Sequence, residues 1–559
     1  MLDLAITGAM ICDGNGGLPY HASVGVEGGR IAEIGGQIGA ARRTINADGL
    51  ALMPGIIDTH THFDAQVTWD PWLTPSPALG VTTAIIGNCG FTIAPCRPEH
   101  RDLSMRHLTH VEGMSLDVLR RGIRWDFESF PEYLASLERR GLGLNVATFF
   151  GHSSLRTFVM GEAATMRTAT DGEIQAMREL LAAGMAAGAV GFASSTAEQH
   201  NGEGGTPMPS RLASPAEFEA LVGVLGEERR GLFMLTKGSR TTIPFLESLA
   251  AASGRPVMIA ALLHNPTNPD ATFADLRAIA AAQARGRKLY GQVSCCPLTN
   301  DFTMASPYPF EGFAAWAPAL RAEGADLCRI YADPDFRRRV KDELSAPARV
   351  RLFNGEWDKL HLLEAALPAN QALEGRSVGE LARAASKDPL DWLLDLAVAE
   401  NLRTVFTAVL LNADEDAVGR MLRDPNACIA LSDAGAHLTF FCDAGFGLHL
   451  LGHWVRERGT FTLAEAVHHL TARQAAIFGL QGRGQIAAGA AADLLLFDPA
   501  SVGRGPKTRV FDLPGGAPRL VTPSAGVHGV WVNGVQVADG KGLAGNGTLP
   551  GQLLRGAAN

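Results

Sequence analysis

The chain has 559 residues, of which 46% are hydrophobic and 19% are charged, and its formal net charge is −9. Such a length allows a large core, and a mildly acidic chain without long basic blocks argues against nucleic acid and anionic membranes as partners. Eight cysteines are too few for a disulfide framework, and no apolar run reaches 18 residues, so we expect a soluble, reduced, cytoplasmic protein.

The two ends of the chain share one sequence pattern, in which short alternating apolar runs are separated by glycine-rich turns. Near the C-terminus the segment 526–543 contains an Asn-Gly pair and an Asp-Gly pair, which favour tight hairpin turns. We therefore expect one small β domain built from residues 1–53 and 480–559, with the middle of the chain inserted between its two parts.

The middle of the chain, residues 54–479, alternates between β-branched runs and helical stretches. Strands that alternate with helices indicate a parallel sheet, and eight such units predict a (β/α)₈ barrel, an α/β fold. Two connections, around 90–144 and 296–425, are too long for one crossover and are expected to be insertions with extra helices and lid loops. The eight runs cover residues 55–60, 81–87, 145–151, 189–195, 231–237, 255–264, 288–295 and 427–433.

Polar side chains stand where several of these runs end, which is where a barrel of this kind places its chemistry. His60 and His62 share one face of an extended chain because they are two residues apart. Cys89, His264 and Asp433 close the second, sixth and eighth runs. Imidazole, thiolate and carboxylate together suit zinc, and Asp433 could accept a proton from water bound there. Taken singly, each residue has an ordinary explanation: a surface or core histidine, a buried cysteine, a helix N-cap. Their shared position favours the metal site.

The segment PGIIDTHTHFD, residues 54–64, resembles the first-strand signature of the amidohydrolase superfamily. Together with VTTAIIGNCGFTIAP, residues 81–95, it resembles the D-aminoacylase branch, the N-acyl-D-amino-acid deacylases. LSDAGAHL, residues 431–438, looks like the eighth-strand aspartate segment, and the segments 29–36 and 482–500 look like two halves of a small β-sandwich. The resemblance implies a TIM-like barrel that hydrolyses an amide with water activated by one or two divalent ions such as Zn²⁺.

Carried over residue by residue, the resemblance implies that His60 and His62 bind the more loosely held metal. It implies that Cys89 is the thiolate ligand, that His264 is the sixth-strand ligand, and that Asp433 is a ligand or the general base.

The sequence departs from the deacylase pattern at two places. The fifth run ends in Thr236 and Lys237 where the deacylases have Thr-His, and no lysine follows His264. A protonated lysine cannot bind a cation, so Lys237 is neutral or carboxylated, or the site has rearranged, or no metal binds tightly. We favour a single metal, with Lys237 as a catalytic residue that stabilises an oxyanion or binds a substrate carboxylate. The expected substrate-binding residues are Arg240, Arg211, Phe150 and His152, with Phe149, Phe440 and Phe441 as further candidates for an apolar pocket.

The leading hypothesis is a metal-dependent hydrolase of the amide bond in a small N-acyl amino acid or related amide. One alternative is a hydrolase of another C–N bond, in a cyclic amide, a carbamate or an amine-bearing ring. A second alternative is a binding relative without catalytic activity. We expect a small-molecule amide as the partner, while homo-oligomerisation is left open.

Overall fold

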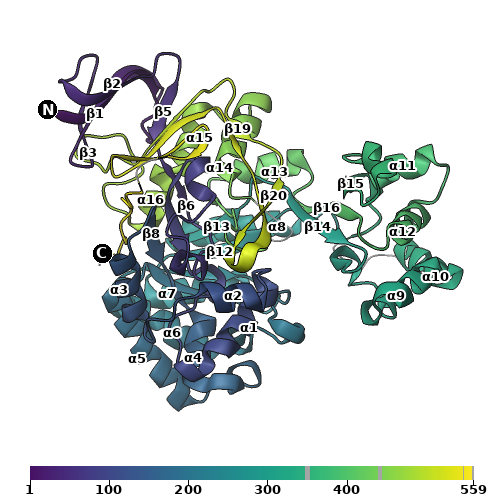
Figure 1. The fold of residues 1–559 in the computed structure, drawn as a ribbon. Coiled ribbons are helices and arrows are strands. Elements are labelled where there is room, and N and C mark those ends of the chain that lie inside the picture. The colour runs from purple at the N-terminus through teal and green to yellow at the C-terminus, as the bar shows by residue number, and fades with distance from the viewer. Residues whose placement is uncertain (347–352, 439–442, 545–546, 557–559) are drawn as a thin grey trace.

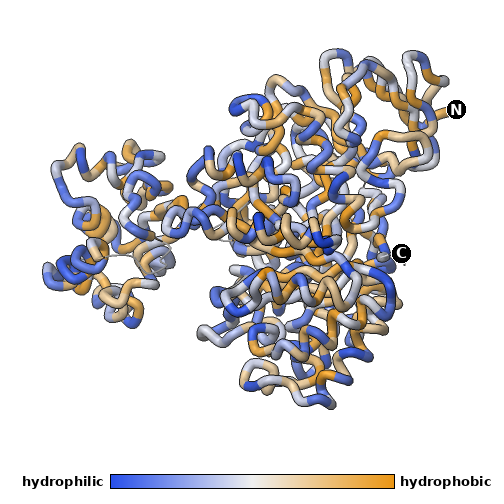
Figure 2. The backbone as a smooth tube through the Cα atoms, turned by 180° about the vertical axis from the view of Figure 1, so that it is seen from behind, coloured by the Kyte–Doolittle hydropathy of each residue, from blue (hydrophilic) through white to orange (hydrophobic). Residues whose placement is uncertain are grey.

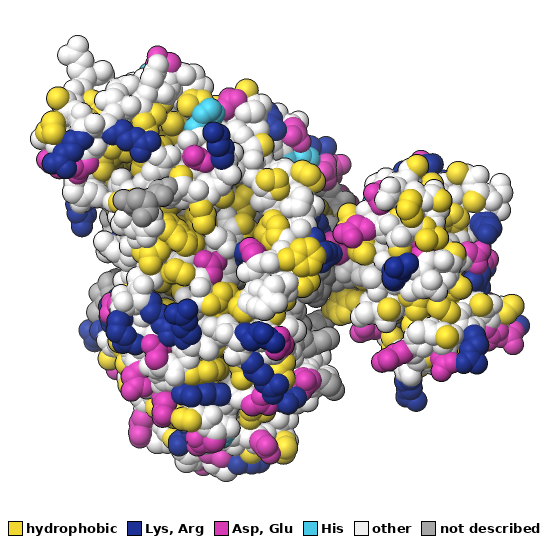
Figure 3. All heavy atoms as spheres, viewed as in Figure 1, with side chains coloured by type: hydrophobic (Ala, Val, Ile, Leu, Met, Phe, Trp, Pro, Cys, Tyr) yellow, Lys and Arg dark blue, Asp and Glu magenta, His cyan; other side chains and the backbone are white. Residues whose placement is uncertain are grey.

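The computed structural model describes residues 1–346, 353–438, 443–544 and 547–556 of a mixed α/β protein (Figure 1). A main body carries both ends of the chain, and a smaller lobe stands to one side of it. Charged side chains of both signs are interspersed over the face shown in Figure 3. Among the described residues, none of the helices has both the length and the hydropathy of a membrane-spanning segment.

The first and last strands of the chain lie in one nine-stranded sheet. Its order is β25-β24-β23-β18-β5-β1-β2-β3, with β4 paired to β1. β5 and β18 join the two halves as antiparallel neighbours, and Asn533 and Gly534 turn the chain between β23 and β24 with positive φ at both positions, as an Asn-Gly hairpin requires. The strands are β1 (Leu2–Ile11), β2 (Tyr20–Glu27), β3 (Arg30–Gly35), β4 (Ala41–Asn46), β5 (Ala51–Pro54), β18 (Leu494–Phe497), β23 (Val527–Val532), β24 (Val535–Asp539) and β25 (Gly542–Leu543).

Two parallel sheets form the centre of the main body, with the orders β6-β7-β8 and β17-β13-β12-β11-β10-β9. Every one of the eight runs expected from the sequence contains one of these strands, and the third contains β8 and β9 with only Phe149 between them. A bridge between Thr61 and Ala434 links the segments that follow β6 and β17. The strands are β6 (Ile56–Asp58), β7 (Val81–Ile86), β8 (Asn145–Thr148), β9 (Phe150–Gly151), β10 (Gly191–Ser195), β11 (Leu232–Thr236), β12 (Val257–Leu262), β13 (Leu289–Val293) and β17 (Ala427–Ile429).

Helices follow most of these strands and lie in both the lower and the upper half of the main body in Figure 1. The capping box at Thr462 and Glu465 is complete, whereas at Ser214 only the hydroxyl half is formed, because the Glu217 side chain is buried elsewhere. These helices are α4 (His152–Met160), α5 (Asp171–Ala187), α6 (Pro215–Glu227), α7 (Ile243–Ser253), α8 (Ala271–Ala284), α13 (Glu415–Leu422), α14 (Phe446–His449), α15 (Leu463–Leu470) and α16 (Ala472–Phe478).

The insertion between β7 and β8 contributes α1 (Arg101–Val111), α2 (Leu116–Gly122) and α3 (Phe130–Arg140). The segment between α1 and α2 lies against the loop after β17, where the His437 amide donates to the Glu112 carbonyl oxygen at 2.5 Å. The insertion therefore contacts the loop that follows the last parallel strand. Four short strands from the C-terminal region complete the main body: β19 (Gly503–Arg504), β20 (Thr508–Leu513), β21 (Ala517–Val521) and β22 (Ser524–Ala525).

The insertion between β13 and β17 forms the separate lobe seen in both ribbon and tube views (Figures 1 and 2). Its antiparallel sheet has the order β14-β16-β15, and its core, which includes Phe310, Trp316 and Phe336, forms a hydrophobic cluster distinct from that of the main body. The insertion therefore has a hydrophobic core of its own, whereas the sequence predicted only extra helices and lid loops. Its elements are β14 (Leu298–Thr303), β15 (Leu360–Glu364), β16 (Val405–Leu411), α9 (Gly324–Ala332), α10 (Pro334–Ser345), α11 (Val378–Ala384) and α12 (Pro389–Ala399).

Candidate metal centre

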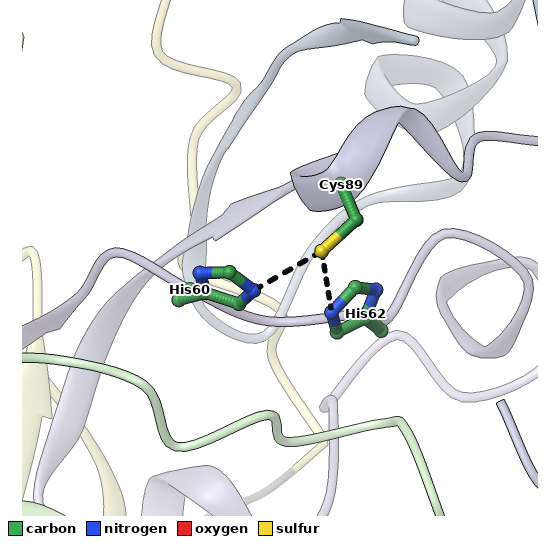
Figure 4. A group of neighbouring side chains, drawn as sticks. All are labelled: His60, His62 and Cys89. Atoms are coloured by element: carbon green, nitrogen blue, oxygen red, sulfur yellow. Dashed lines mark hydrogen bonds between the residues drawn. The ribbon is translucent and has the colours of Figure 1, made fainter. Parts of the chain in front are cut away.

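Two imidazoles and one thiol converge beyond the ends of β6 and β7 (Figure 4). The Cys89 sulfur lies 3.5 Å from His60 Nε2 and 3.9 Å from His62 Nε2, and all three side chains are buried. These ligand atoms lie within 4.8 Å of one another. Cys89 has a φ of 56°, and this left-handed backbone follows from the tight turn that begins at Gly87. The turn directs the thiol toward the two histidines.

The Asp433 carboxylate contacts both imidazoles from the loop that follows β17. Its Oδ1 lies 3.3 Å from His60 Nε2 and 3.5 Å from His62 Nε2. In a tetrahedral zinc site with the usual bond lengths, two nitrogen ligands are ~3.3 Å apart and a nitrogen and a sulfur are ~3.5 Å apart. The separations of His60 from Cys89 and of Asp433 from both imidazoles are close to these edges, and Cys89 lies somewhat farther from His62. The donor set of two imidazoles, a thiol and a carboxylate therefore fits a borderline divalent ion such as Zn²⁺.

Each imidazole is held from its far side by a polar residue on another element. His60 Nδ1 lies 2.7 Å from the amide oxygen of Gln292 on β13, and this oxygen only accepts, so Nδ1 carries the hydrogen. The unprotonated Nε2 of His60 is then directed toward the cluster. His62 Nδ1 lies 3.1 Å from Oε1 of Glu112, although the pair is not aligned as a hydrogen bond. Such partners of the far nitrogen orient metal-binding histidines.

Burial and the neighbouring charges act in opposite directions on the ligand side chains. Burial raises the pKa of the Cys89 thiol, but His60 and His62 outweigh it and lower this pKa to about 7. Burial lowers the pKa of both histidines, and the anionic neighbours Cys89, Glu112 and Asp433 raise it above the ordinary value. Burial likewise raises the pKa of Asp433, while the two imidazoles hold it well below its usual range. The anionic groups thus stabilise positive charge at this position, whether on imidazolium or on a metal ion.

The cluster lines a small cavity of about 60 Å³. A larger depression of about 740 Å³ lies in the terminal sheet, but the described residues place no group of metal ligands there. The small cavity is lined by His60, His62, Cys89, Phe91, Glu112, His200, Thr236, Ala261, Leu431, Asp433, Ala436 and His437.

Comparison with known proteins identifies the family. Residues 43–538 match the amidohydrolase family. The chain belongs to this family. It is 30% identical to D-aminoacylase from Alcaligenes xylosoxydans xylosoxydans, over 96% of this chain and 94% of that protein. It is 29% identical to N-acyl-D-aspartate deacylase from the same organism, over 99% of this chain and 95% of the relative.

Solved structures give the same assignment. The N-acyl-D-glutamate deacylase of Bordetella bronchiseptica, determined with zinc and a phosphonate inhibitor that mimics the tetrahedral intermediate, has a TM-score of 0.65 and 26% identity, covering 99% of both chains. A D-aminoacylase structure has a TM-score of 0.67 and 26% identity, covering 99% of this chain and 100% of that chain. The resemblance seen in the sequence is thereby confirmed.

In this amidohydrolase, two residues expected near the metal lie away from the cavity. Lys237 Nζ forms an ion pair with Asp275 on α8 at 2.9 Å, and the cavity is instead lined by Thr236, whose hydroxyl is 3.0 Å from the Cys89 sulfur. His264 lies beyond the end of β12, with its ring 6.4 Å from that of Phe273. Neither Lys237 nor His264 lines the cavity, so their positions do not support the roles expected of them.

Phe150 and His152, both expected to bind substrate, are buried in the main body instead. The Phe150 ring packs on Phe130 at 4.6 Å. His152 Nδ1 lies 2.8 Å from the Ser194 hydroxyl, and Nε2 lies 2.8 Å from Glu217 Oε1, so both ring nitrogens have partners inside the protein. These positions correct the expectation: both side chains pack the protein interior and neither reaches the cavity.

The two arginines expected to bind substrate flank the loop that follows β10. Arg211 Nη1 donates to the His200 carbonyl oxygen at 3.3 Å, and Arg240 Nη2 donates to the Ala213 carbonyl oxygen at 3.0 Å. Arg211 is partly buried and Arg240 is exposed, and neither side chain lines the cavity. Phe440 and Phe441 lie outside the described residues.

Three residues of the site were not predicted from the sequence. Glu112 comes from an insertion, His200 from a loop that follows β10, and Gln292 from the middle of β13. Only the position of Gln292 on the strand that precedes β17 in the sheet pointed to the site, because strands of a parallel sheet bring their ends together.

Proposed function

We propose that this amidohydrolase cleaves the amide bond of a small N-acyl amino acid with the help of a bound divalent ion. The observation that carries the proposal is the group of His60, His62 and Cys89, whose donor atoms lie within 4.8 Å of one another, with the Asp433 carboxylate in contact with both imidazoles. The similarity to D-aminoacylase and the N-acyl-D-amino-acid deacylases over nearly the whole chain supports a linear amide as the substrate.

The four residues of the cluster would hold one ion. When bound, Zn²⁺ would polarise the substrate carbonyl and lower the pKa of a water molecule toward neutrality. We propose one ion because the fifth and sixth strands present Thr236 and Ala261 to the cavity, and neither is a zinc ligand of the usual kind.

Asp433 is proposed as the general base. Its carboxylate lies against both imidazoles at the cavity, where it can accept the proton of the water that attacks the carbonyl carbon. The same carboxylate then transfers this proton to the amide nitrogen, the C–N bond breaks, and a carboxylate and an amine are released. Glu112 and Gln292 keep the two imidazoles in place during these steps, and Phe91 and Leu431 provide apolar walls that limit access of bulk water.

We also propose that the two parallel sheets close into a (β/α)₈ barrel and that the terminal sheet belongs to a β-sandwich domain. The bridge between Thr61 and Ala434, which links the segments after the first and last strands, supports closure. Domain limits at 1–53, 54–479 and 480–559 agree with the switch from the terminal sheet to the parallel strands between β5 and β6.

Arg211 and Arg240 remain our proposal for binding a substrate carboxylate, because Arg211 donates to the carbonyl oxygen of His200 and Arg240 lies close enough to Arg211 for their charges to interact. All cysteines among the described residues are free, which supports a reducing, cytoplasmic location.

The test is metal quantification on the purified protein together with a panel of N-acyl-D- and N-acyl-L-amino acids. We expect about one zinc per chain, turnover of at least one N-acyl amino acid, and loss of turnover when a chelator removes the metal. A protein that binds no zinc and shows no change in thermal stability when zinc is added would refute the proposal, because a ligand of the folded state must stabilise it.

A further inference from the structure

One histidine outside the metal cluster lines the same cavity. His200 lies in the loop that follows β10, and its ring meets that of Phe91 edge to face, with a centroid distance of 5.0 Å. Phe91 also lies next to the ligand His62, at a centroid distance of 6.2 Å. His200 is therefore close to the proposed reaction centre without being a member of the ligand group.

The hydrogen bonds around His200 determine which ring nitrogen carries the hydrogen. Nδ1 lies 2.6 Å from the Ser195 hydroxyl oxygen, and this oxygen already accepts a hydrogen bond from the Ala197 amide at 3.2 Å. In the described part of the chain, the only acceptor for the hydroxyl hydrogen of Ser195 is His200 Nδ1. Nδ1 is then an acceptor, so the hydrogen of the neutral ring is on Nε2.

The Nε2–H group is available to a ligand. Within the described residues Nε2 makes no hydrogen bond, whereas the ring lines the cavity. Burial, with the nearby His437 and His62, lowers the pKa of His200 to about 3, so the ring stays neutral at neutral pH.

The loop holds His200 in a fixed position. The Met208 amide donates to the His200 carbonyl oxygen at 3.2 Å, and Arg211 donates to the same oxygen at 3.3 Å. The Ser210 hydroxyl donates to the carbonyl oxygen of Ser195 at 2.8 Å, which fixes the residue that contacts Nδ1. A donor held in this way needs little reorganisation when charge develops on a substrate.

We propose that His200 is a catalytic residue whose Nε2–H group donates a hydrogen bond to the carbonyl oxygen of the scissile amide. The inference rests on the proposed function. The hydrogen bond becomes stronger as the carbonyl carbon becomes tetrahedral and the oxygen gains negative charge, so it stabilises the transition state more than the bound substrate. This donor takes the place that the sequence suggested for Lys237, whose ammonium group is bound to Asp275.

The test compares His200→Ala, His200→Gln and the wild-type holoenzyme, with His528→Ala on the exposed face of β23 as the matched control. We expect His200→Ala to lower kcat by roughly 10²–10³-fold, the usual cost of losing one oxyanion donor. KM and zinc content are expected to change little. Affinity for a phosphonate analogue of the tetrahedral centre should fall by a similar factor. His200→Gln, whose amide still donates from near the Nε2 position, should retain more activity than His200→Ala.

Three results would overturn the inference. The first is a loss in kcat of less than about threefold in His200→Ala. The second is a rise in KM alone with unchanged phosphonate affinity, and the third is loss of zinc together with activity, which would make His200 part of the metal site. If His200→Ala does not fold, His200→Leu decides, because its apolar side chain cannot donate a hydrogen bond: phosphonate affinity equal to that of the wild type would refute the proposal. A wild-type enzyme that hydrolyses no N-acyl amino acid would refute the proposed function and this inference with it, whereas an active wild type with an equally active His200→Ala would refute the inference alone.

Discussion

Replacing Glu112 with glutamine tests whether the insertion between β7 and β8 contributes to metal binding. The Glu112 carboxylate is buried, neither oxygen has a hydrogen-bond partner among the described residues, and Oε1 lies 3.1 Å from His62 Nδ1. Glutamine keeps the shape of the side chain but removes its negative charge. The substitution therefore removes an anionic partner of the His62 ring that is not itself a proposed metal ligand.

The size of the effect follows from this arrangement. Partners of the far nitrogen of a metal-binding histidine typically change metal affinity by about 10–100-fold. This range corresponds to about 1.4–2.8 kcal/mol of binding free energy, because each tenfold change is about 1.4 kcal/mol. We expect a value in this range for Glu112→Gln, since the carboxylate is buried with His62 and solvent does not screen their interaction.

The assay is zinc affinity by competition with a chromophoric chelator, with Glu99→Gln on the exposed part of the same insertion as the control. Activity at saturating zinc gives a second measurement, which we expect to be close to that of the wild type. If Glu112→Gln and Glu99→Gln bind zinc equally well, the carboxylate does not support His62, and the insertion has no part in holding the metal.

Four further outcomes are expected. Asp433→Asn should abolish hydrolysis with the melting temperature little changed; measurable turnover in that variant would remove Asp433 from the role of base. Cys89→Ala should lower the zinc content of the purified protein to well below one per chain, and full occupancy by elemental analysis would contradict its assignment as a ligand. Glu217→Ala should destabilise the fold by about 3–5 kcal/mol in denaturant titrations, because it leaves the buried Arg156 guanidinium without its carboxylate partner; a change below about 1 kcal/mol would contradict this. Burial lowers the pKa of His107 to about 4, so between pH 6.5 and pH 4 the unfolded chain binds a proton that the folded chain does not, and stability falls as pH falls; His107→Gln should flatten this dependence in melts of the metal-free protein, and identical slopes would refute the sign.

The strands and the central ligand group could be predicted from the sequence, and the reasons are physical. Fully buried parallel strands give continuous apolar runs, which makes them visible without an alignment. The two-residue spacing of His60 and His62 places both rings on one side of an extended chain, and the positions of Cys89 and Asp433 at the ends of other runs bring them to the same edge of the sheets.

The positions of the other site residues depend on structural details that a run of apolar residues does not define. Thr236 and Lys237 are neighbours at a strand end and point to opposite sides, so a shift of one position decides which of them meets the Cys89 sulfur. Ala261 lines the cavity while His264, three residues later, has left the strand. Glu112 comes from a long connection whose path is set by tertiary packing, and no local pattern predicts where it lies.

The pairing of β5 with β18 has a consequence for how the protein is made. Residues 51–54 leave the ribosome long before residues 494–497, so the N-terminal strands have an open edge while the rest of the chain is synthesised. An unpaired edge of this kind can join the edge of another chain, and products truncated before residue 494 should therefore be prone to aggregate. Variants shortened at the C-terminus are therefore expected to give a low yield of folded protein, whatever the effect of the truncation on catalysis.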